Sequence, residues 1–416
     1  MKLSLFGRLA MAVFASLTLG LGMTACGGGT IGYMWILGQQ YNQIAGFKID
    51  DYTGNLTQIE GSPFITNGVF PVSIVVKPGG RYVYVINRGT CPASGCGTAP
   101  NVSQSVALYS VGGDGTLTFQ QSYQTQGYNS MWAQMDSSGS YLYVLDKYSP
   151  SYNSTSGLYN GPNTDGNGAI TAFTADSSTG RLTLITNIQT QHNGVNTPFF
   201  EVGAAPFMMQ SASGCLLTLN SGNTISPYTV GGSGQLAYTT TQVFPIGGAT
   251  NITSINSGGS YVFLTDAGAD TIDGFTVGSG CTLTTLQGGN TPNIAGQVNP
   301  MNTLVDSTSK YLYVLNQTNT LTLPGNAYSS ISAFTINSTN QELQPITGAP
   351  YTVGSGPVCM VEDPTHQYMY ISNHNDGTVT GKVLDPTTGI LSSLSRGSTF
   401  TSTGLAGCLT LSGAVD

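Results

Sequence analysis

Charge is scarce in this sequence. Only 7% of its 416 residues are charged, and 11 Lys and Arg stand against 19 Asp and Glu for a net charge of −8. Nucleic acids and anionic membrane surfaces are bound by clustered Lys and Arg, and the sequence has no such cluster. Its 3 His and 7 Cys are also too dispersed for a metal site. We therefore expect no nucleic-acid partner, no bound metal and no cofactor.

Long apolar runs are missing except at the N-terminus. There, Lys2 and Arg8 precede an apolar run from Leu9 to Leu21, and small residues end the segment at Ala25. This order is typical of an export signal, and the run is too short for a comfortable membrane span. We therefore expect residues 1–25 to be a signal peptide and the body of the protein to leave the cytoplasm.

Cys26 follows Thr24-Ala25 and precedes three glycines. This arrangement resembles a bacterial lipobox, in which the cysteine is acylated and becomes the mature N-terminus. Met23 departs from the Leu that is usual at its position, and ordinary secretion with cleavage elsewhere is the alternative. The lipoprotein interpretation makes residues 26–32 a tether that holds the body to the cell envelope, periplasmic or at the surface, through the lipid alone.

What the sequence does contain is one strand pattern that returns along its whole length. The pattern is Arg81 to Asn87, in which aromatic and β-branched residues face both sides and Asn ends the run. It predicts a strand that is buried on both faces and ends in a polar turn. Further copies are 140–146, 215–220, 260–266, 310–316 and 367–373, and a weaker seventh copy is 33–37.

Each copy belongs to a larger unit. A strand that Pro usually opens precedes it, as in Pro71 to Val76, and two strands joined by an Asp- or Gly-containing turn follow it. The first unit lacks its opening strand, and residues 406–411 form an opening strand with nothing after it. These two fragments complete one another. We therefore predict a single seven-bladed β-propeller over residues 33–416, with four antiparallel strands per blade and a ring closed by the C-terminal strand.

The repeated strands resemble those of a known protein family. Tyr-Val-Tyr-Val-x-Asn strands that follow Pro-x-x-x-x-x-x-Pro-x-Gly, as in Pro71 to Asn87, are similar to the YVTN-type propellers and the wider seven-bladed lactonase family, which includes 6-phosphogluconolactonase-like proteins. The resemblance implies the propeller fold over nearly all of the mature chain. Its catalytic members carry an Arg, His and Glu constellation on the propeller mouth, and that constellation cannot be placed residue by residue on this sequence.

Six cysteines remain after Cys26 is assigned to lipid. An even number of cysteines in an exported protein predicts disulfides. Cys91 and Cys96 bracket a short loop, Cys359 and Cys408 occupy matching positions in adjacent opening strands, and Cys215 and Cys281 lie beside turns of neighbouring blades. These three pairings are geometrically sensible, and free buried thiols are the alternative.

The loops indicate which face of the propeller carries function. Residues 88–104, 147–167, 189–205 and 288–299 form long loops at the end where the repeated strands stop, whereas the other face has tight turns. Binding groups concentrate on loops that a rigid scaffold presents. His192 and Glu201 share one loop and are the best catalytic pair, and the candidate binding residues on the same face are Arg88, Lys147, Tyr148, Tyr152, Tyr159, Asp266 and His374.

Each candidate also has a structural explanation. Asp266 is one copy of the strand-ending Asn or Asp and suits a turn cap, and the tyrosines could pack their own loops. The expected role is therefore binding of a small molecule, a glycan or a protein partner by an envelope-anchored monomer. The alternative is a lactonase-like hydrolase that resembles 6-phosphogluconolactonase and acts on a sugar lactone. The sequence leaves open whether the protein is an enzyme.

Overall fold

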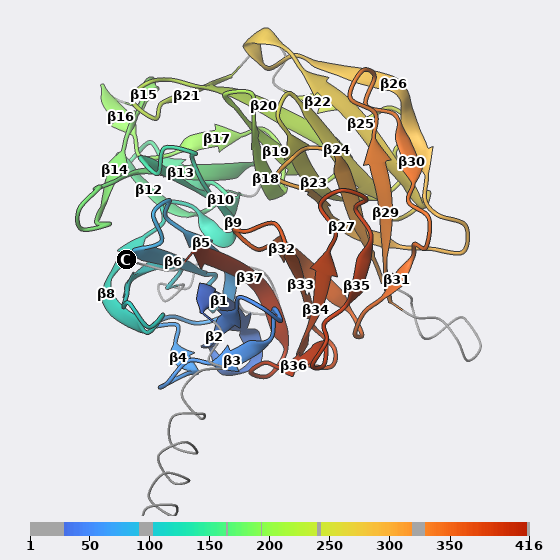
Figure 1. Ribbon diagram of the computed structural model, residues 1–416. Coiled ribbons are helices and arrows are strands. Elements are labelled where there is room, and N and C mark those ends of the chain that lie inside the picture. Colours follow the sequence, from blue (N-terminus) through green and yellow to red (C-terminus); the bar gives the residue numbers. More distant parts are fainter. Residues whose placement is uncertain are drawn as a thin grey trace, which may run out of the picture.

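The computed structural model describes residues 29–90, 103–163, 165–192, 194–238, 243–317 and 329–413. These residues form seven antiparallel sheets arranged as blades around a central axis (Figure 1). The described part is almost entirely β-structure, with two short 3-10 turns, η1 (Gln39–Tyr41) and η2 (Ser279–Cys281). None of its helical segments has the length and apolar character needed to cross a bilayer. The predicted seven-bladed propeller is confirmed.

Blades 1 to 7 are numbered in the order in which their second strands follow one another along the chain. Within each blade, the strands are given from the innermost outward. Blade 1 contains β37 (Ala406–Gly413), β1 (Thr30–Gly38), β2 (Gln43–Asp50) and β3 (Leu56–Gln58), with β4 (Phe64–Ile65) beside β2. Blade 2 contains β5 (Pro71–Val76), β6 (Tyr82–Asn87), β7 (Ser105–Val111) and β8 (Leu117–Gln124). Blade 3 contains β9 (Tyr128–Met135), β10 (Tyr141–Tyr148), β13 (Gly168–Ala175) and β14 (Leu182–Ile185), with β17 (Phe200–Val202) beside β13.

The remaining blades follow in the same order. Blade 4 contains β18 (Pro206–Ala212), β19 (Cys215–Asn220), β20 (Thr224–Val230), β21 (Leu236–Tyr238) and β22 (Phe244–Pro245). Blade 5 contains β23 (Ile252–Gly258), β24 (Tyr261–Asp266), β25 (Thr271–Val277) and β26 (Leu283–Pro292). Blade 6 contains β27 (Pro300–Val305), β28 (Tyr311–Asn316), β29 (Ser330–Ile336), β30 (Leu343–Pro345) and β31 (Tyr351–Thr352). Blade 7 contains β32 (Pro357–Glu362), β33 (Tyr368–Asn373), β34 (Thr378–Leu384), β35 (Leu391–Ser393) and β36 (Thr399–Thr401).

The C-terminal strand closes the ring. β37 pairs antiparallel with β1, from Gly32 opposite Gly413 to Gly38 opposite Ala406, and thereby becomes the innermost strand of the blade that starts the chain (Figure 1). The seven innermost strands then contact one another in an unbroken circle, in the order β5, β9, β18, β23, β27, β32 and β37. Because the circle is complete, no innermost strand is left without a neighbour on either side.

Two predicted boundaries differ in detail. β1 begins at Thr30 instead of Tyr33, because Thr30 and Gly32 already pair with Asp50 and Ile49. The loops 147–167 and 189–205 are also more ordered than expected. Each contains a small hairpin of its own, β11 (Pro150–Asn153) with β12 (Leu158–Pro162), and β15 (Asn187–His192) with β16 (Val195–Thr197).

Aromatic side chains in the second strands of five blades bond the neighbouring blade. Tyr84 lies in the middle of β6, is fully buried, and donates its hydroxyl to the backbone carbonyl of Gly180 in the β13–β14 turn of blade 3 at 2.7 Å. The equivalent bonds are Tyr143 to Gly234, Tyr313 to Gly389, Tyr370 to Gly54, and the Trp35 indole to Gly115. A buried hydroxyl needs such a partner, so the repeat encodes a cross-blade tether as well as a packed core.

Candidate functional site

We call the face where the second strands end the loop face, and the opposite face the tight-turn face. On the loop face, the residue after each strand end donates its backbone N–H to the carbonyl of the residue that precedes the innermost strand of the same blade, as Arg88 does to Phe70 at 2.9 Å. The same bond joins Gln39 to Leu405, Ser221 to Ala205, Ala267 to Asn251, Gln317 to Asn299 and His374 to Gly356. In blade 3 the second strand continues to Tyr148, and the corresponding residue, Lys147, lies within it directly after Asp146. These seven residues form the loop-face rim of the central channel.

The rim exists because every blade has a bulge at this end. The pairing of innermost and second strands shifts register there, between Pro71 and Ser73 in blade 2 and at the matching place in the other six blades. A bulge bends its strand and redirects the neighbouring side chains. The same backbone device therefore presents seven different side chains around one opening.

The three basic residues of the rim come from one arc of the ring of blades. Arg88 and Lys147 belong to adjacent blades 2 and 3, and His374 belongs to blade 7, with Gln39 of blade 1 between them. The Arg88 guanidinium carbon lies 4.1 Å from the centre of the Phe70 ring, and Lys147 Nζ lies 5.5 Å from the centre of the Tyr148 ring. Burial lowers the pKa of Arg88, yet a guanidinium remains charged at neutral pH. The opposite arc carries Ser221, Ala267 and Gln317.

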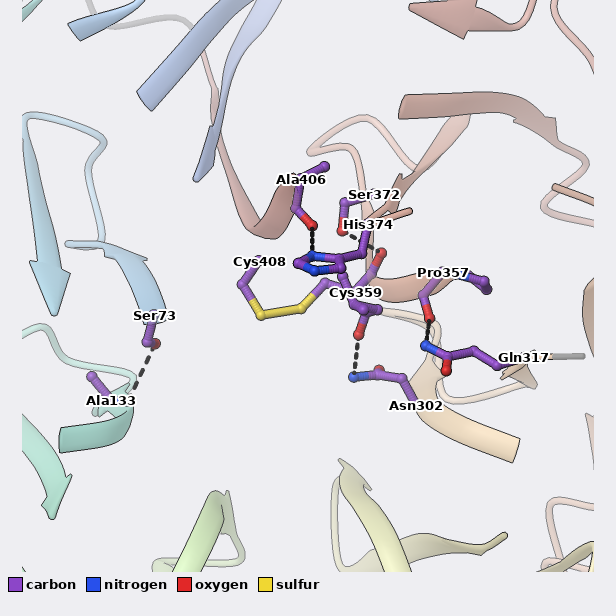
Figure 2. Close-up of a disulfide and its surroundings, with 11 residues drawn as sticks. Ser73, Ala133, Asn302, Gln317, Pro357, Cys359, Ser372, His374, Ala406 and Cys408 are labelled. Carbon is purple, nitrogen blue, oxygen red and sulfur yellow. Dashed lines mark hydrogen bonds between the residues drawn. A yellow bond between two sulfur atoms is a disulfide. The ribbon is translucent and has the colours of Figure 1, made fainter. Parts of the chain in front are cut away.

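His374 is held by both innermost strands that flank it. Its backbone N–H bonds Gly356, next to β32, and its Nδ1 lies 2.9 Å from the carbonyl oxygen of Ala406 in β37. A carbonyl can only accept a hydrogen bond, so Nδ1 carries the proton and neutral His374 keeps a lone pair on Nε2. Figure 2 shows this ring beside the Cys359–Cys408 disulfide, which joins the same two strands. The arrangement fixes one tautomer of a partly exposed histidine.

The strand-ending Asn and Asp residues themselves are buried and serve the turns. Asp266 is 1% exposed and accepts hydrogen bonds from the backbone of Thr250, Asn251, Gly268 and Ala269. Burial opposes ionisation, but these bonds outweigh it and lower the pKa of Asp266. The side chain is therefore fully used as a cap for its own loop.

Asp146 occupies the same repeat position as Asp266, but its pKa is raised where that of Asp266 is lowered. It accepts bonds from the hydroxyls of Ser130 and Thr171 and from the backbone of Gly127, and it is fully buried. Burial raises its pKa to about 6 in spite of those bonds. Asp273, in β25, is also raised to about 6, again mainly by burial. Neither carboxyl belongs to the rim.

The other predicted site residues lie around blade 3. Tyr152 and Tyr159 pack together across the β11–β12 hairpin with ring centres 5.2 Å apart, and Tyr159 also packs edge-on against Phe199. Glu201 is exposed on β17 and accepts a hydrogen bond from Asn167 at 3.1 Å. His192 pairs through its backbone with Val195, and its side chain lies outside the described structure.

Two of the three predicted disulfides are present. Cys215 bonds Cys281 across blades 4 and 5, and Cys359 bonds Cys408 across blades 7 and 1. Cys26, Cys91 and Cys96 lie outside the described residues. Over the ranges the structure covers, no three His, Cys, Asp or Glu side chains come close enough to hold a metal ion.

A cavity of about 410 Å³ occupies the central channel below the rim. Its walls come from all seven innermost strands, from the level of Ser73 and Cys359 down to Pro78, Asp136 and Ser137 in the tight turns. The cavity therefore opens on the tight-turn face, whereas the cationic side chains are on the loop face. We treat the two as separate sites, because the cavity walls include no rim residue among those described.

Sequence reasoning missed the polar side chains of this channel. Gln134, Gln210 and Asn256 lie at one register position, opposite Tyr143, Leu217 and Phe263 of their second strands. The signal was available, because each is an amide in an opening strand whose equivalents in β5 and β32 are valines. It could be interpreted only once the register of each strand was known.

Comparison with known proteins agrees with this architecture. The family model described as "Lactonase, 7-bladed beta-propeller" matches residues 30–154 and 280–404, more than half of the chain. No curated protein matches the sequence.

Solved structures share the fold at low identity. A candidate 6-phosphogluconolactonase of Bacteroides fragilis has a TM-score of 0.66 at 15% identity, over 92% of this chain and 98% of its own. The periplasmic gluconolactonase of Pseudomonas aeruginosa has a TM-score of 0.66 at 14% identity, over 92% and 99%. A candidate 6-phosphogluconolactonase of Bacteroides uniformis has 0.67 at 14%, over 92% and 99%. With the family model matching both ends of the ring and the seven blades closed by β37, the chain belongs to the seven-bladed β-propeller lactonase family.

Proposed function

We propose that the protein is an exported lactonase-like hydrolase that opens a sugar lactone carrying an anionic group. The observation that supports the proposal is the loop-face rim, where Arg88 and His374 follow the ends of their second strands and Lys147 follows Asp146 in β10. Of the 11 Lys and Arg in the sequence, two occupy this position in the adjacent blades 2 and 3. Because the chain belongs to the lactonase family, we favour hydrolysis over the binding role that the sequence alone predicted.

Arg88 and Lys147 would bind the anionic group of the substrate. Guanidinium and ammonium groups form charge-assisted hydrogen bonds with phosphate or carboxylate oxygens. Each is partly shielded by an aromatic ring, Phe70 or Tyr148, which reduces its exposure to water. Phosphorylated lactones such as 6-phosphogluconolactone therefore suit this arc better than neutral lactones.

His374 would act as the general base. Its Nε2 lone pair accepts a proton from a water molecule as the water oxygen bonds to the lactone carbonyl carbon. The ring C–O bond then breaks, the ring oxygen takes up the proton, and the product is the open-chain hydroxy acid. The bond from Nδ1 to Ala406 fixes the tautomer and stabilises the imidazolium that forms.

The test is hydrolysis of 6-phosphogluconolactone by the purified protein, measured above the spontaneous rate. We expect His374→Asn to lower kcat by about 10²-fold or more, the usual contribution of a general base. Arg88→Ala and Lys147→Ala should raise KM for the phosphorylated lactone and leave glucono-1,5-lactone less affected. Gln317→Ala is the matched control, because Gln317 holds the same rim position without charge.

Several outcomes would overturn the proposal. Turnover that never exceeds the spontaneous rate would show that the protein is not a lactonase. Full activity in His374→Asn would show that His374 is not the general base. Loss of activity in His192→Ala or Glu201→Ala, with His374→Asn active, would instead place the chemistry in the loop over residues 189–205. Those two variants should otherwise retain activity.

Location outside the cytoplasm is part of the proposal. Two disulfides join different blades, and disulfides persist in oxidising compartments. We place the lipid on Cys26, so wild-type protein should fractionate with membranes and Cys26→Ser should be soluble. Equal membrane association of both would remove the lipid anchor.

A further inference from the structure

The central cavity is a second place where polar groups converge; over the part of the chain that the structure describes, its lining includes none of the rim residues, and it reaches the Cys359–Cys408 disulfide beside His374 (Figure 2). One residue from each blade stands at the register position opposite the middle of the second strand, and all of them except Leu304 line the cavity. These residues are all partly exposed, whereas the buried position one residue before them packs between the blades. They are Val75, Gln134, Gln210, Asn256, Leu304, Val361 and Thr410.

The amides at this level come from one part of the ring. Gln134, Gln210 and Asn256 belong to the consecutive blades 3, 4 and 5, whereas Val361 of blade 7 and Val75 of blade 2 lie on either side of Thr410 in blade 1. Trp132 of β9 also lines the cavity beside the amides. A molecule in the channel therefore meets three amide side chains on one side, and two valines that flank a single threonine on the other.

Each amide is held at one end and open at the other. Gln134 Nε2 donates to Met135, Gln210 Nε2 donates to Ser211 and to Ser257, and Asn256 Oδ1 accepts from the Val305 backbone at 3.0 Å. Within the described residues, the Oε1 atoms of both glutamines and Nδ2 of Asn256 have no protein partner. The two Oε1 atoms are free to accept hydrogen bonds, and Asn256 Nδ2 is free to donate them. A hydroxyl group can pair with all three, because it both donates and accepts.

The cavity lining offers an anion no cationic partner. It includes no Lys, Arg or His, and Asp136 at the mouth is its one ionisable side chain among the residues described. The Asp136 carboxylate already accepts bonds from the backbone of Ser138 and Tyr141, so it acts as a turn cap. Lys77, which bonds the carbonyl of Gly139 in the same turn, offsets part of its charge.

We propose that the channel binds one uncharged, hydroxyl-rich molecule of monosaccharide size, which enters from the tight-turn face. The volume of about 410 Å³ lies within the roughly 300–1,000 Å³ of small-molecule sites. Hydroxyl groups bond Gln134, Gln210 and Asn256, and the apolar face of the ring lies toward Val75 and Val361. This site takes a neutral ligand on the tight-turn face, whereas the proposed lactone site takes an anion on the loop face, so either can fail alone.

The two tryptophans provide a direct readout. Trp132 lines the cavity, and Trp35 is fully buried between blades 1 and 2. Methyl β-D-glucopyranoside, added up to about 10 mM, a range that detects weak millimolar binding, should change the tryptophan fluorescence of the wild-type protein. Trp132→Phe should abolish the change while the sugar still gives saturation-transfer signals in NMR. D-Gluconate, an anion with similar hydroxyls, should bind more weakly.

Variants of the amide wall complete the test. Gln210→Leu should weaken binding by about tenfold, which corresponds to one hydrogen bond of about 1.4 kcal/mol, and Gln134→Leu should do the same. Gln317→Leu on the loop-face rim is the matched control and should leave sugar binding unchanged. Should a leucine variant not fold, Gln210→Met keeps the side-chain length and removes the open acceptor.

Three results would overturn the proposal. One is the absence of both a fluorescence change and a saturation-transfer signal at the highest sugar concentration, which would leave an ordinary hydrated channel. Another is binding that both amide variants retain in full. The third is gluconate binding that is tighter than sugar binding and lost in Arg88→Ala, which would place the ligand on the rim instead.

Discussion

Cys215 and Cys281 occupy, between blades 4 and 5, the two positions that a tyrosine and a glycine occupy at other blade interfaces. Cys215 lies five residues before the strand-ending Asn220, as Tyr82 does before Asn87. Cys281 has φ 62° and stands at the turn position that Gly180 holds in blade 3 with φ 67°. At Gly180, a Cβ would come within 2.6 Å of the Tyr82 ring, so a side chain is excluded there. With the ring replaced by a cysteine, a second cysteine fits and the disulfide forms.

This exchange predicts the outcome of replacing the disulfide. Cys215→Ser combined with Cys281→Ser should lower the free energy of unfolding by about 2–5 kcal/mol, because a cross-link over 66 residues is lost. Cys215→Tyr combined with Cys281→Gly should recover part of that loss by restoring the contact used elsewhere. The measurement is denaturant unfolding. A Tyr–Gly variant no more stable than the Ser–Ser variant would contradict the equivalence.

The hydroxyl tethers should contribute individually. Tyr84→Phe removes the bond to Gly180 and leaves a buried carbonyl without its partner, at an expected cost of about 1–2 kcal/mol in the free energy of unfolding. Tyr52→Phe is the matched control, since Tyr52 is 84% exposed and should change stability little. Equal effects of the two substitutions would show that the hydroxyl bond does not stabilise the interface.

Asp146 and Asp266 should respond to pH with opposite sign. Burial raises the pKa of Asp146 to about 6, so the folded protein holds this proton more tightly than the unfolded chain. Its contribution to stability is therefore largest below pH about 4 and is lost as pH rises to about 6. Asp146→Asn should stabilise the protein at pH 7 by up to about 3 kcal/mol, and the gain should vanish at low pH. Asn stands at this position in four other blades, as Asn87, Asn220, Asn316 and Asn373.

Asp266 should show the opposite dependence of stability on pH. Burial alone would raise its pKa, but hydrogen bonds from Thr250, Asn251 and Gly268 lower it, so its stabilisation is present at neutral pH and is lost as the pH falls below about 4. Asp266→Asn places an amide donor against backbone donors and should destabilise the protein by about 1–3 kcal/mol at pH 7. Unfolding curves at pH 7 and pH 4 measure both variants. A stabilised Asp266→Asn, or a destabilised Asp146→Asn at pH 7, would contradict the assignment.

The fold was readable from sequence because its information is periodic. Strands such as Tyr82–Asn87 alternate over a fixed length, and the incomplete first and last units can only be completed by pairing 406–411 with 33–37. The Cys359–Cys408 pair followed for the same reason, since equivalent positions in neighbouring opening strands lie side by side, and Cys215–Cys281 followed from its place beside turns of neighbouring blades. The rim and the channel wall were harder to predict. The place of Gln134 in the channel depends on strand register, and the place of Arg88 on the rim depends on a bulge, and neither register nor bulge can be read from the residue pattern alone.

Removal of the closing strand should abolish the fold. Deleting residues 404–416 removes β37, leaves β1 as an open edge and eliminates the Cys359–Cys408 bridge. Cys408→Ser removes the bridge alone and should leave a folded protein of reduced stability. Thermal unfolding distinguishes the two. A truncated protein with the midpoint of the full chain would contradict the closed ring.

The last prediction concerns orientation on the membrane. Gly29 accepts a hydrogen bond from Asp51 in the β2–β3 turn, so the chain enters the propeller on the tight-turn face. Only residues 27–29 separate Cys26 from β1, a reach of about 10 Å when extended. A lipid on Cys26 therefore holds the tight-turn face, with the channel mouth, close to the bilayer and presents the loop face outward.

Protease added to protein on lipid vesicles should then cut the exposed turn of the β11–β12 hairpin, between Asn153 and Leu158, and spare the tight turn at Gly232. The Cys26→Ser protein in solution is the control and should be cut at both places, because nothing shields its tight-turn face. Cleavage at Gly232 with protection of the β11–β12 hairpin in the vesicle-bound protein would reverse the orientation, and the lactone rim would then face the membrane.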